Sequence, residues 1–239
     1  DWEIPVGKST NYIAGYSGYI IRTEEQLNDF LAKNPNYGTG PVGGLPIQLG
    51  SFVFVDRSGP EGTPDGVIDN YDKTILYANP NPIVFGLNLG ANWKNFSIDA
   101  TFTGKLKNPK NYYAIADYVD IALQMFNTEW MYDSWTPENP DASLPMMAPY
   151  GYKSYERSDT DFWYKDASYI RLSNLNIGYT FKFDRPLGNA ISSIKLFLTG
   201  TNLFYLSNFK HWDPELNPSW SGVGYPVMRT LGGGLSVNF

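Results

Sequence analysis

The stretch that decides the fold reads IVFGLNLGANWKNFSIDATFTG and spans residues 83–104. Over 83–91 every second residue is apolar, and from residue 86 onward the intervening residues are glycine or asparagine. Over 96–102 the pattern repeats, with serine, aspartate and threonine as the intervening residues. Strict alternation over this length is typical of a β-strand with one apolar and one polar face. The stretch therefore predicts a β-hairpin that turns around 93–94.

Three more segments alternate in the same way, at 167–183, 192–204 and 230–239. Between the first two, DRPLGN at 184–189 predicts a tight turn because it contains proline and glycine. The stretch PIQLGSFVFV, 46–55, is a candidate for one further strand. From the hairpin onward the sequence thus predicts an antiparallel all-β protein with five strands.

The predicted connections alternate between short turns and very long loops. The long ones cover 105–165 and 205–225 and are rich in proline, asparagine and aromatic residues. Within the first of them, apolar residues three and four apart over 113–132 predict a short loop helix. Short turns on one side and long loops on the other are typical of transmembrane β-barrels of the outer membrane.

The strand lengths and the positions of the aromatic residues favour the same interpretation. Strands of about ten residues suit a tilted crossing of a hydrocarbon layer roughly 30 Å thick. Aromatic girdles at the two membrane interfaces would account for residues at both strand ends: Trp93, Phe96, Phe181 and Phe183 beside the short turns, and Trp163, Tyr164 and Tyr169 beside the long loops.

A soluble β-sandwich is the main structural alternative. Structureless loops this long are uncommon inside a compact domain, and an apolar edge strand such as the last one invites aggregation. Five strands are fewer than the eight or so that close a membrane barrel, so the chain is expected to be the carboxy-terminal piece of a larger barrel.

Composition excludes several classes of function. The formal net charge of −6 argues against a nucleic-acid-binding surface. The absence of cysteine excludes disulfides and thiolate metal sites. His211 has no neighbouring nucleophile in an activating arrangement, and Asp159 and Asp161 fit solvated loop charges better than a glycosidase pair. No catalytic residue and no enzymatic activity are therefore expected.

Several ordered blocks resemble a known family. FWYKDASYIRLSNLNIGYTF, TGTNLFYLSNFKHWDPELNP and YPVMRTLGGGLSVNF look like the carboxy-terminal signatures of SusC/RagA-type TonB-dependent outer-membrane transporters. WTPENP and DGVIDNYD also resemble elements of that family. The matching positions are Asp166 to Leu172, Gly178-Tyr179, Asn202 to Phe204, Asp213 to Glu215, Tyr225, Pro226, Arg229 and Phe239.

The resemblance implies a 22-stranded barrel with an amino-terminal plug, which imports oligosaccharides or peptides and takes energy from TonB. It also implies a SusD-like lipoprotein lid and an outer-membrane location in a Gram-negative bacterium. No cofactor is expected, apart from the candidate calcium ion considered below. The plug and the TonB-binding segment are not within this sequence. The final strand resembles the assembly signal that the barrel-assembly machinery recognises, through Gly234, Leu235, Val237 and Phe239.

The resemblance and the pattern together suggest two regions. Residues 1–82 are expected to be mostly extracellular loop, with one or two strands and a short helix near 23–33. The helix is indicated by Thr23 and Gln26, which form a capping box. Residues 83–239 are expected to supply barrel strands and the long extracellular loops.

Aromatic side chains in the loops are candidates for binding substrate or for contacting the lid. Aromatic faces stack on sugars and contact apolar parts of peptides, and they are equally enriched at protein interfaces. The sequence leaves these two roles open. The candidate residues are Trp130, Trp135, Tyr150, Trp212 and Trp220.

An acidic loop offers a candidate calcium site, because hard carboxylate oxygens are the ligands that Ca²⁺ prefers. The spacing does not fit the twelve-residue EF-hand loop, and an acidic surface turn is the alternative. Relatives often carry a compact Asp-x-Asn-Gly-Asp-Gly here, whereas this chain has an insertion. The candidate ligands are Asp56, Asp65, Asp69 and Asp72.

Two arginines on predicted strands, Arg171 and Arg229, are expected to face the lumen or lie at an interface, because lipid-facing arginine is costly. A second functional hypothesis remains open: a secreted or surface carbohydrate-binding β-module, which the aromatic loops would also suit. The sequence itself does not distinguish glycan from peptide as the substrate.

Overall fold

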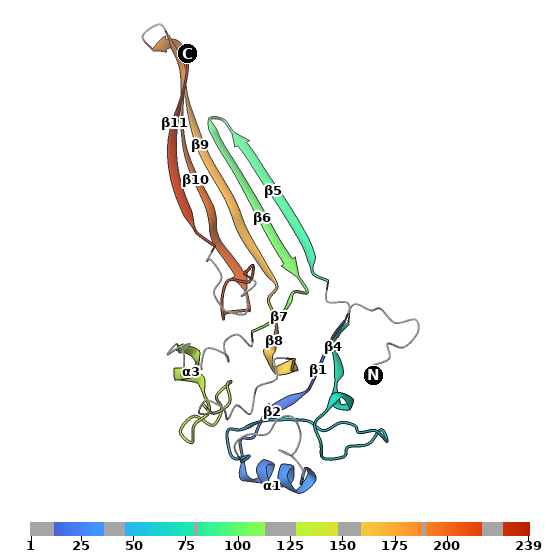
Figure 1. Ribbon diagram of the computed structural model, residues 1–239. Helices are drawn as coiled ribbons and strands as arrows, with labels where there is room; N and C mark the ends of the chain where they lie inside the picture. Colours follow the sequence, from blue (N-terminus) through green and yellow to red (C-terminus); the bar gives the residue numbers. More distant parts are fainter. Residues whose placement is uncertain are drawn as a thin grey trace. The chain divides into compact units, whose positions relative to one another are not determined.

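A computed structural model describes residues 12–35, 46–78, 81–112, 128–147, 159–187, 190–216 and 227–239. The chain divides into two compact units, which are described separately (Figure 1). The first unit comprises residues 1–80, 109–165 and 218–223, and the second comprises 81–108, 166–217 and 224–239. Among the described residues, no helix is long and apolar enough to cross a membrane.

The second unit is built around one antiparallel five-stranded sheet, in which the strands lie side by side in the order β11-β10-β9-β6-β5 (Figure 1). All five strands that the alternation predicts are present. Their bounds are β5, Ile83–Trp93; β6, Phe96–Leu106; β9, Tyr169–Leu187; β10, Ile191–Ser207; and β11, Thr230–Asn238.

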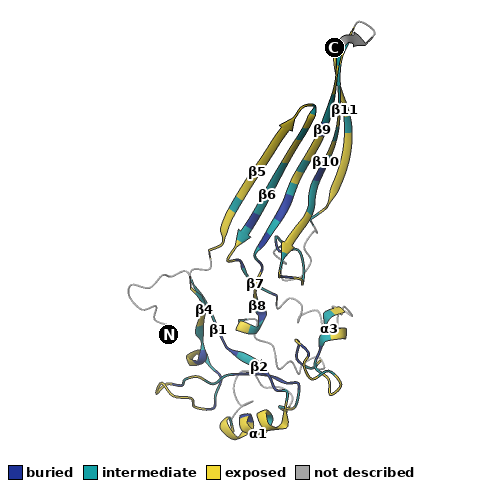
Figure 2. Cartoon of the chain, turned by 180° about the vertical axis from the view of Figure 1, so that it is seen from behind, coloured by how far each residue is buried: buried dark blue, intermediate teal, exposed yellow. Residues whose placement is uncertain are grey.

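The register of the sheet keeps apolar side chains on one face across all five strands. One row shows this: Ala91 pairs with Ile98, Ile98 with Ile177, and Ile177 with Leu198. Because side chains alternate along a strand, the residues between them point to the other face. Many apolar side chains of this face are exposed in the chain described here, among them Leu87, Leu89, Ile98, Leu196 and Leu198 (Figure 2).

A β-bulge in the neighbouring strands β9 and β10 keeps apolar and polar side chains on their separate faces. Thr101 pairs with Asn174, and Asn174 also pairs with Thr201; the next pairs are Phe102 with Leu172 and Leu172 with Phe204. One extra residue on β9 and two on β10 are accommodated there. Asn202 takes a positive φ of 51°, which asparagine tolerates better than most residues. Because Leu172 and Leu175 are three residues apart, a regular β9 strand without the bulge would turn its apolar positions beyond this point to the other face.

Two strands are longer than expected, and one predicted turn begins too early in the sequence. β9 has 19 residues and β10 has 17, against the roughly ten that a membrane crossing needs. The predicted turn at 184–189 lies largely within β9, which continues to Leu187 and pairs there with Ile191. The pairing is irregular between Ile191 and Ser193, so the strands tolerate a proline where the ladder is interrupted.

The first unit contains short paired strands and short helices. The candidate strand at 46–55 proves to be β3, a partner of β2 outside the five-stranded sheet. β1 pairs with β4, and β7 pairs with β8. The bounds are β1, Tyr12–Gly15; β2, Gly18–Ile20; β3, Phe52–Phe54; β4, Thr74–Ala78; β7, Pro109–Asn111; β8, Tyr164–Asp166; α1, Glu24–Lys33; α3, Thr128–Asp133; and the 3₁₀ turns η1, Asn70–Asp72, and η2, Asp161–Trp163.

Helix α1 begins where the capping residues predict. The Thr23 side chain accepts a hydrogen bond from the Gln26 backbone N–H, and Gln26 Oε1 accepts one from the N–H of Arg22, 2.8 Å away. The apolar side of the helix packs Leu27 and Phe30 against Ile21 and Val53. The sequence predicts a helix over 113–132. Helix α3 occupies the end of this range, and residues 113–127 lie outside the described residues.

Aromatic side chains form much of the interior of the first unit. Phe52 packs against Phe54 and Phe162 with ring centroids 5.4 and 4.8 Å apart, and Trp163 packs against Phe162 at 4.8 Å. Trp163 is completely buried, so its predicted place in a membrane girdle is wrong. It fills the core of a loop unit, because large rings bury much apolar surface per residue.

The edge strand β11 depends on a glycine beneath an aromatic ring. Phe197 on β10 pairs with Gly234, and a methyl group added at Gly234 would lie 2.3 Å from Phe197 Cζ. At Gly232, two residues away on the same face, the nearest atom to such a methyl group would be Thr199 Cγ2 at 3.3 Å. The two glycines therefore differ in how much room a side chain would have.

We expect Gly234→Ala in the full-length protein to destabilise the β10–β11 pairing by about 1–3 kcal/mol through overpacking. The measurement is the temperature at which the folded band disappears on an unboiled gel. Gly232→Ala is the matched control and should shift this temperature far less. Adding Phe197→Ala to Gly234→Ala should restore it; no difference between the two alanine variants would contradict the prediction.

Candidate functional site on the polar face of the sheet

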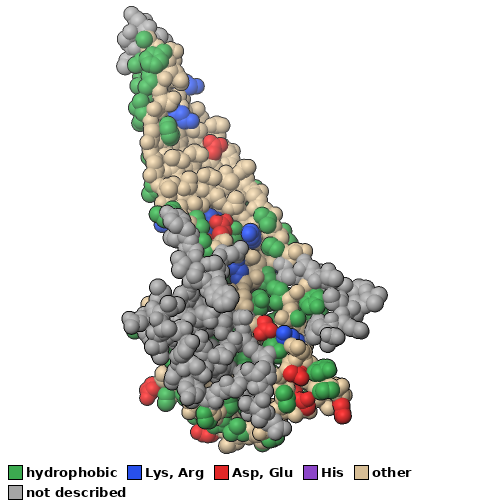
Figure 3. Space-filling view, viewed as in Figure 1, with side chains coloured by type: hydrophobic (Ala, Val, Ile, Leu, Met, Phe, Trp, Pro, Cys, Tyr) green, Lys and Arg blue, Asp and Glu red, His purple; other side chains and the backbone are tan. Residues whose placement is uncertain are grey.

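The face of the sheet opposite the apolar one is rich in hydroxyl and amide side chains. Threonine, serine and asparagine form cross-strand rows there, such as Thr101, Asn174, Thr201 and Thr230. Figure 3 shows that most side chains visible over the sheet are neither hydrophobic nor charged. Such a surface offers hydrogen-bond donors and acceptors to a polar solute without strongly selecting its charge.

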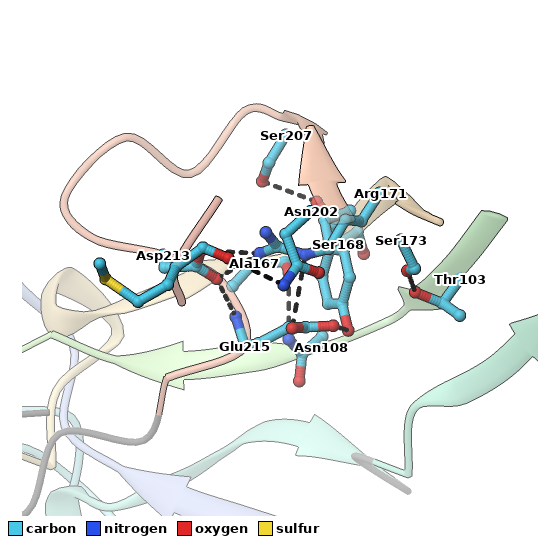
Figure 4. Close-up of polar contacts among 12 residues, drawn as sticks. Thr103, Asn108, Ala167, Ser168, Arg171, Ser173, Asn202, Ser207, Asp213 and Glu215 are labelled. Atoms are coloured by element: carbon cyan, nitrogen blue, oxygen red, sulfur yellow. Dashed lines mark hydrogen bonds and ion pairs between the residues drawn. The ribbon is translucent and has the colours of Figure 1, made fainter. Parts of the chain in front are cut away.

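At the loop end of this face lies a buried arginine. Arg171, on β9, pairs with Thr103 and Tyr205, so its side chain lies on the polar face, as the cost of lipid exposure predicts. Its side chain is 3% exposed. Nη2 donates to both carboxylate oxygens of Asp213, at 2.6 and 2.7 Å (Figure 4). Nε lies 3.4 Å from Glu215 Oε2 but makes no hydrogen bond, so that contact is purely electrostatic.

Two tyrosines complete this arginine clamp, which we define as Tyr169, Arg171, Tyr205, Asp213 and Glu215. Tyr169 Oη donates to Glu215 Oε1 at 2.5 Å, and the guanidinium lies 5.0 Å from the centroid of the Tyr205 ring. Tyr169 is 5% exposed, so it is not the girdle residue that the sequence predicts. The clamp fixes the segment that follows β10 onto the polar face, 42 residues along the chain from Arg171.

A corner of backbone-directed hydrogen bonds holds the strands beneath the clamp. Asp166 Oδ1 accepts from the N–H groups of Asn108 and Ser168, at 3.2 and 3.0 Å. Asn108 Nδ2 donates to Ala167 O at 3.0 Å, and Ser207 Oγ donates to Ser168 O at 2.7 Å (Figure 4). The Asp-Ala-Ser block therefore joins the ends of β6, β9 and β10.

The clamp joins two of the signature blocks that are separate in the sequence. The first block supplies Tyr169 and Arg171, and the second supplies Asp213 and Glu215. Outside the clamp, Asn202 Nδ2 of the second block donates to Met228 O of the third, which ties the bulge to the start of the last strand. Sequence reasoning missed the clamp itself; the recurrence of Arg, Asp and Glu in those blocks was the available signal.

The predicted aromatic candidates do not form one cluster. Trp130 is 1% exposed inside the first unit, so no ring face is open to a ligand. Trp135 is half-buried in that unit against Gly50. Trp212 is half-buried in the second unit, where its ring packs against Phe209, 5.1 Å away. Tyr150 and Trp220 lie outside the described residues.

The acidic loop uses its carboxylates to hold its own backbone. The buried Asp72 accepts from the N–H groups of Arg57, Ser58 and Asp69. Asp69 Oδ1 accepts from Tyr71 N, Asp65 Oδ1 from Val67 N, and Asp56 Oδ2 from Gly66 N. Burial raises the pKa of Asp56; the Gly66 hydrogen bond opposes this shift, and Asp72 and Asp65 add to it.

In the described part of the chain, no group of three or more acidic or histidine side chains is placed to hold a metal ion. The hydrogen bonds account for Asp56, Asp65, Asp69 and Asp72 as acceptors that shape the loop. The calcium site stays a prediction that this arrangement does not support.

Three residues of the predicted assembly signal lie on the edge strand β11, and the fourth follows it. Leu235 pairs with Leu196 and Val237 with Ile194, so both lie on the apolar face. Phe239 follows the end of β11 and is 85% exposed. Arg229 precedes β11 and is exposed. The role of this strand in assembly remains a prediction.

The sheet, its apolar face and the long connections define the class: these are the carboxy-terminal strands of a large antiparallel transmembrane β-barrel. The comparisons agree. The chain is 26% identical to the TonB-dependent receptors P26 and P3 of Formosa agariphila, over 81% and 95% of its length. It is 25% identical to the TonB-dependent receptor SusC of Bacteroides thetaiotaomicron over 82% of its length.

Solved structures show the same fold. The RagAB peptide transporter matches 96% of the chain with a TM-score of 0.62 and 19% identity. The "closed-closed" state of the RagAB peptide importer matches 100% of it with a TM-score of 0.62 and 18% identity. The chain covers 23% and 25% of those chains, and about a fifth of the curated relatives. No family model matches.

The resemblance to SusC/RagA-type TonB-dependent transporters is thereby confirmed. The curated relatives are TonB-dependent receptors, and the solved structures are of a peptide transporter.

We expect Arg171→Met in the full-length protein to release the segment after β10. It leaves Asp213 and Glu215 without their cation, and breaking a buried ion pair costs about 3–5 kcal/mol. Trypsin should then cut faster after the exposed Lys210. Arg229→Met, at an exposed arginine, is the control and should leave the cleavage rate unchanged; equal rates in both variants and the wild type would contradict the prediction.

Proposed function

We propose that the chain is part of a TonB-dependent outer-membrane importer of oligosaccharides or peptides. The observation that carries this proposal is the two-faced sheet: an exposed apolar face suits lipid, and a largely uncharged polar face suits the wall of an aqueous lumen. The similarity to SusC and to the RagAB transporter supports transport as the activity.

The proposal includes a location and a sidedness. The protein lies in the outer membrane of a Gram-negative bacterium, with its short turns toward the periplasm. Residues 1–82 and the loops 105–165 and 205–225 lie mostly outside the cell. The arginine clamp then lies at the extracellular end of the strands, where it fixes the base of the second long loop against the lumen wall.

The proposed partners follow from the same resemblance. They are a SusD-like lipoprotein lid, TonB acting through segments outside this chain, the barrel-assembly machinery, and outer-membrane lipid. The acidic chain suits no nucleic acid. We assign it no catalytic residue and no cofactor.

The test is import by cells that carry the full-length gene. Deletion should abolish growth on the transported oligosaccharide or peptide mixture, and disruption of TonB should have the same effect. The full-length protein should need detergent for extraction and should bring a lipoprotein with it on purification. Its appearance in the soluble fraction without detergent would reject the proposal.

The last strand generates a separate expectation. Deleting Phe239 from the full-length protein should lower its level in the outer membrane, because the terminal aromatic residue belongs to the proposed assembly signal. The measurement is the amount of folded protein in isolated membranes, and Met228→Ala, at an exposed residue before β11, serves as control. Normal levels of the truncated protein would refute this role.

A further inference from the structure

A groove lies on the apolar face of the second unit, at the end of the sheet near the long loops. Its volume is about 610 Å³, within the range of 300–1,000 Å³ that is usual for small-molecule sites. Four apolar side chains from four strands line it: Phe85, Leu106, Ile170 and Leu206. Its other end is formed by Ser168, Ser207 and Asn208.

One row of the sheet supplies three of the apolar side chains that line the groove. Phe85 pairs with Gly104, Gly104 with Ile170, and Ile170 with Leu206. A methyl group at Gly104 would lie 2.4 Å from Phe85 Cζ, so the phenyl ring leans over the glycine. The Phe85 ring therefore fills the space above Gly104 and lines the groove there, and Leu206, 64% exposed, lines it on the β10 side.

The polar end of the groove is held in place but is uncharged. Ser207 Oγ donates to Ser168 O at 2.7 Å and accepts from Phe209 N at 3.1 Å. The Asn208 side chain is exposed, and it makes no hydrogen bond within the described residues. It offers an amide donor and acceptor beside the apolar channel. The matching ligand has a long apolar chain and an uncharged hydrogen-bonding linkage.

The surroundings decide which ligand of this kind fits. The groove is continuous with the apolar face that carries Leu87 and Leu89 on β5, and this face lies against hydrocarbon in a membrane barrel. At the strand ends, hydrocarbon gives way to the polar linkages of lipids. We propose that the groove holds one acyl chain of a membrane lipid, whose ester or amide linkage hydrogen-bonds to Asn208.

Selectivity for a bound lipid over bulk lipid comes from shape and from the polar end. Neighbouring lipid is as apolar as leucine, so the hydrophobic effect gives the groove no preference. Close packing between Phe85 and Leu206 and one hydrogen bond at the polar end supply it instead. This inference rests on the proposed membrane location.

The test counts lipids retained by the full-length protein. The purified protein is delipidated in detergent, titrated with palmitoyl-oleoyl-phosphatidylethanolamine and examined by native mass spectrometry. The wild type should keep one phospholipid at collision energies that remove the others. Leu206→Trp, which fills the groove, should lose that lipid, and Asn208→Ala should raise its apparent Kd roughly fivefold, the worth of one hydrogen bond.

Leu89→Trp is the matched control, because Leu89 is 53% exposed on the same face but outside the groove. It should retain the lipid. Equal retention by wild type and Leu206→Trp overturns the inference, as does a retained adduct of peptide mass that Leu206→Trp loses. The folded band on an unboiled gel and the need for detergent are measured in the same samples. If both persist while the lipid is not retained, only the proposed lipid site is refuted. If both are lost, the proposed membrane function is refuted as well.

Discussion

The register of the five-stranded sheet is the constraint on which the rest of the second unit depends. A strand that crosses hydrocarbon must pair its backbone N–H and C=O groups with neighbouring strands, because no water is available to them. Since side chains alternate, a slip of one residue would bring the row of Ala91, Ile98 and Ile177 onto the polar face. The apolar side chains of Ile170 and Leu206 and the guanidinium of Arg171 lie on opposite faces because this register holds.

Much of this arrangement could be predicted from the sequence. Alternation alone locates all five strands of the sheet and separates their two faces. The bulge could not be predicted in this way, although Leu172 and Leu175 are three residues apart and so break the alternation. A local break in pattern is ambiguous between the end of a strand and an extra residue within it, and only the pairing of Phe102 with Leu172 resolves it.

The aromatic residues show where pattern reasoning ends. Composition indicates an excess of rings, and those at the short turns, such as Trp93 and Phe96, are exposed as a girdle requires. Trp163 and Tyr169, only six residues apart, have the same side-chain chemistry but are buried for different reasons. Trp163 fills an aromatic core, and Tyr169 donates to Glu215. In the sequence, an aromatic residue of a membrane girdle cannot be told from one in a core until its long-range contacts are known.

Sequence reasoning missed the arginine clamp because its charges are distant along the chain, yet its electrostatics are simple. The Arg171 side chain is 3% exposed and would be costly to bury alone, whereas the side chains of Asp213 and Glu215 are 14% and 31% exposed. Two carboxylates face one guanidinium, so the positive charge of Arg171 is balanced. The second negative charge is partly solvated, because the Glu215 side chain is 31% exposed. The segment after β10 supplies both carboxylates, and its position is therefore set by a charge fixed on β9. The loop that follows therefore has a defined starting point against the polar face.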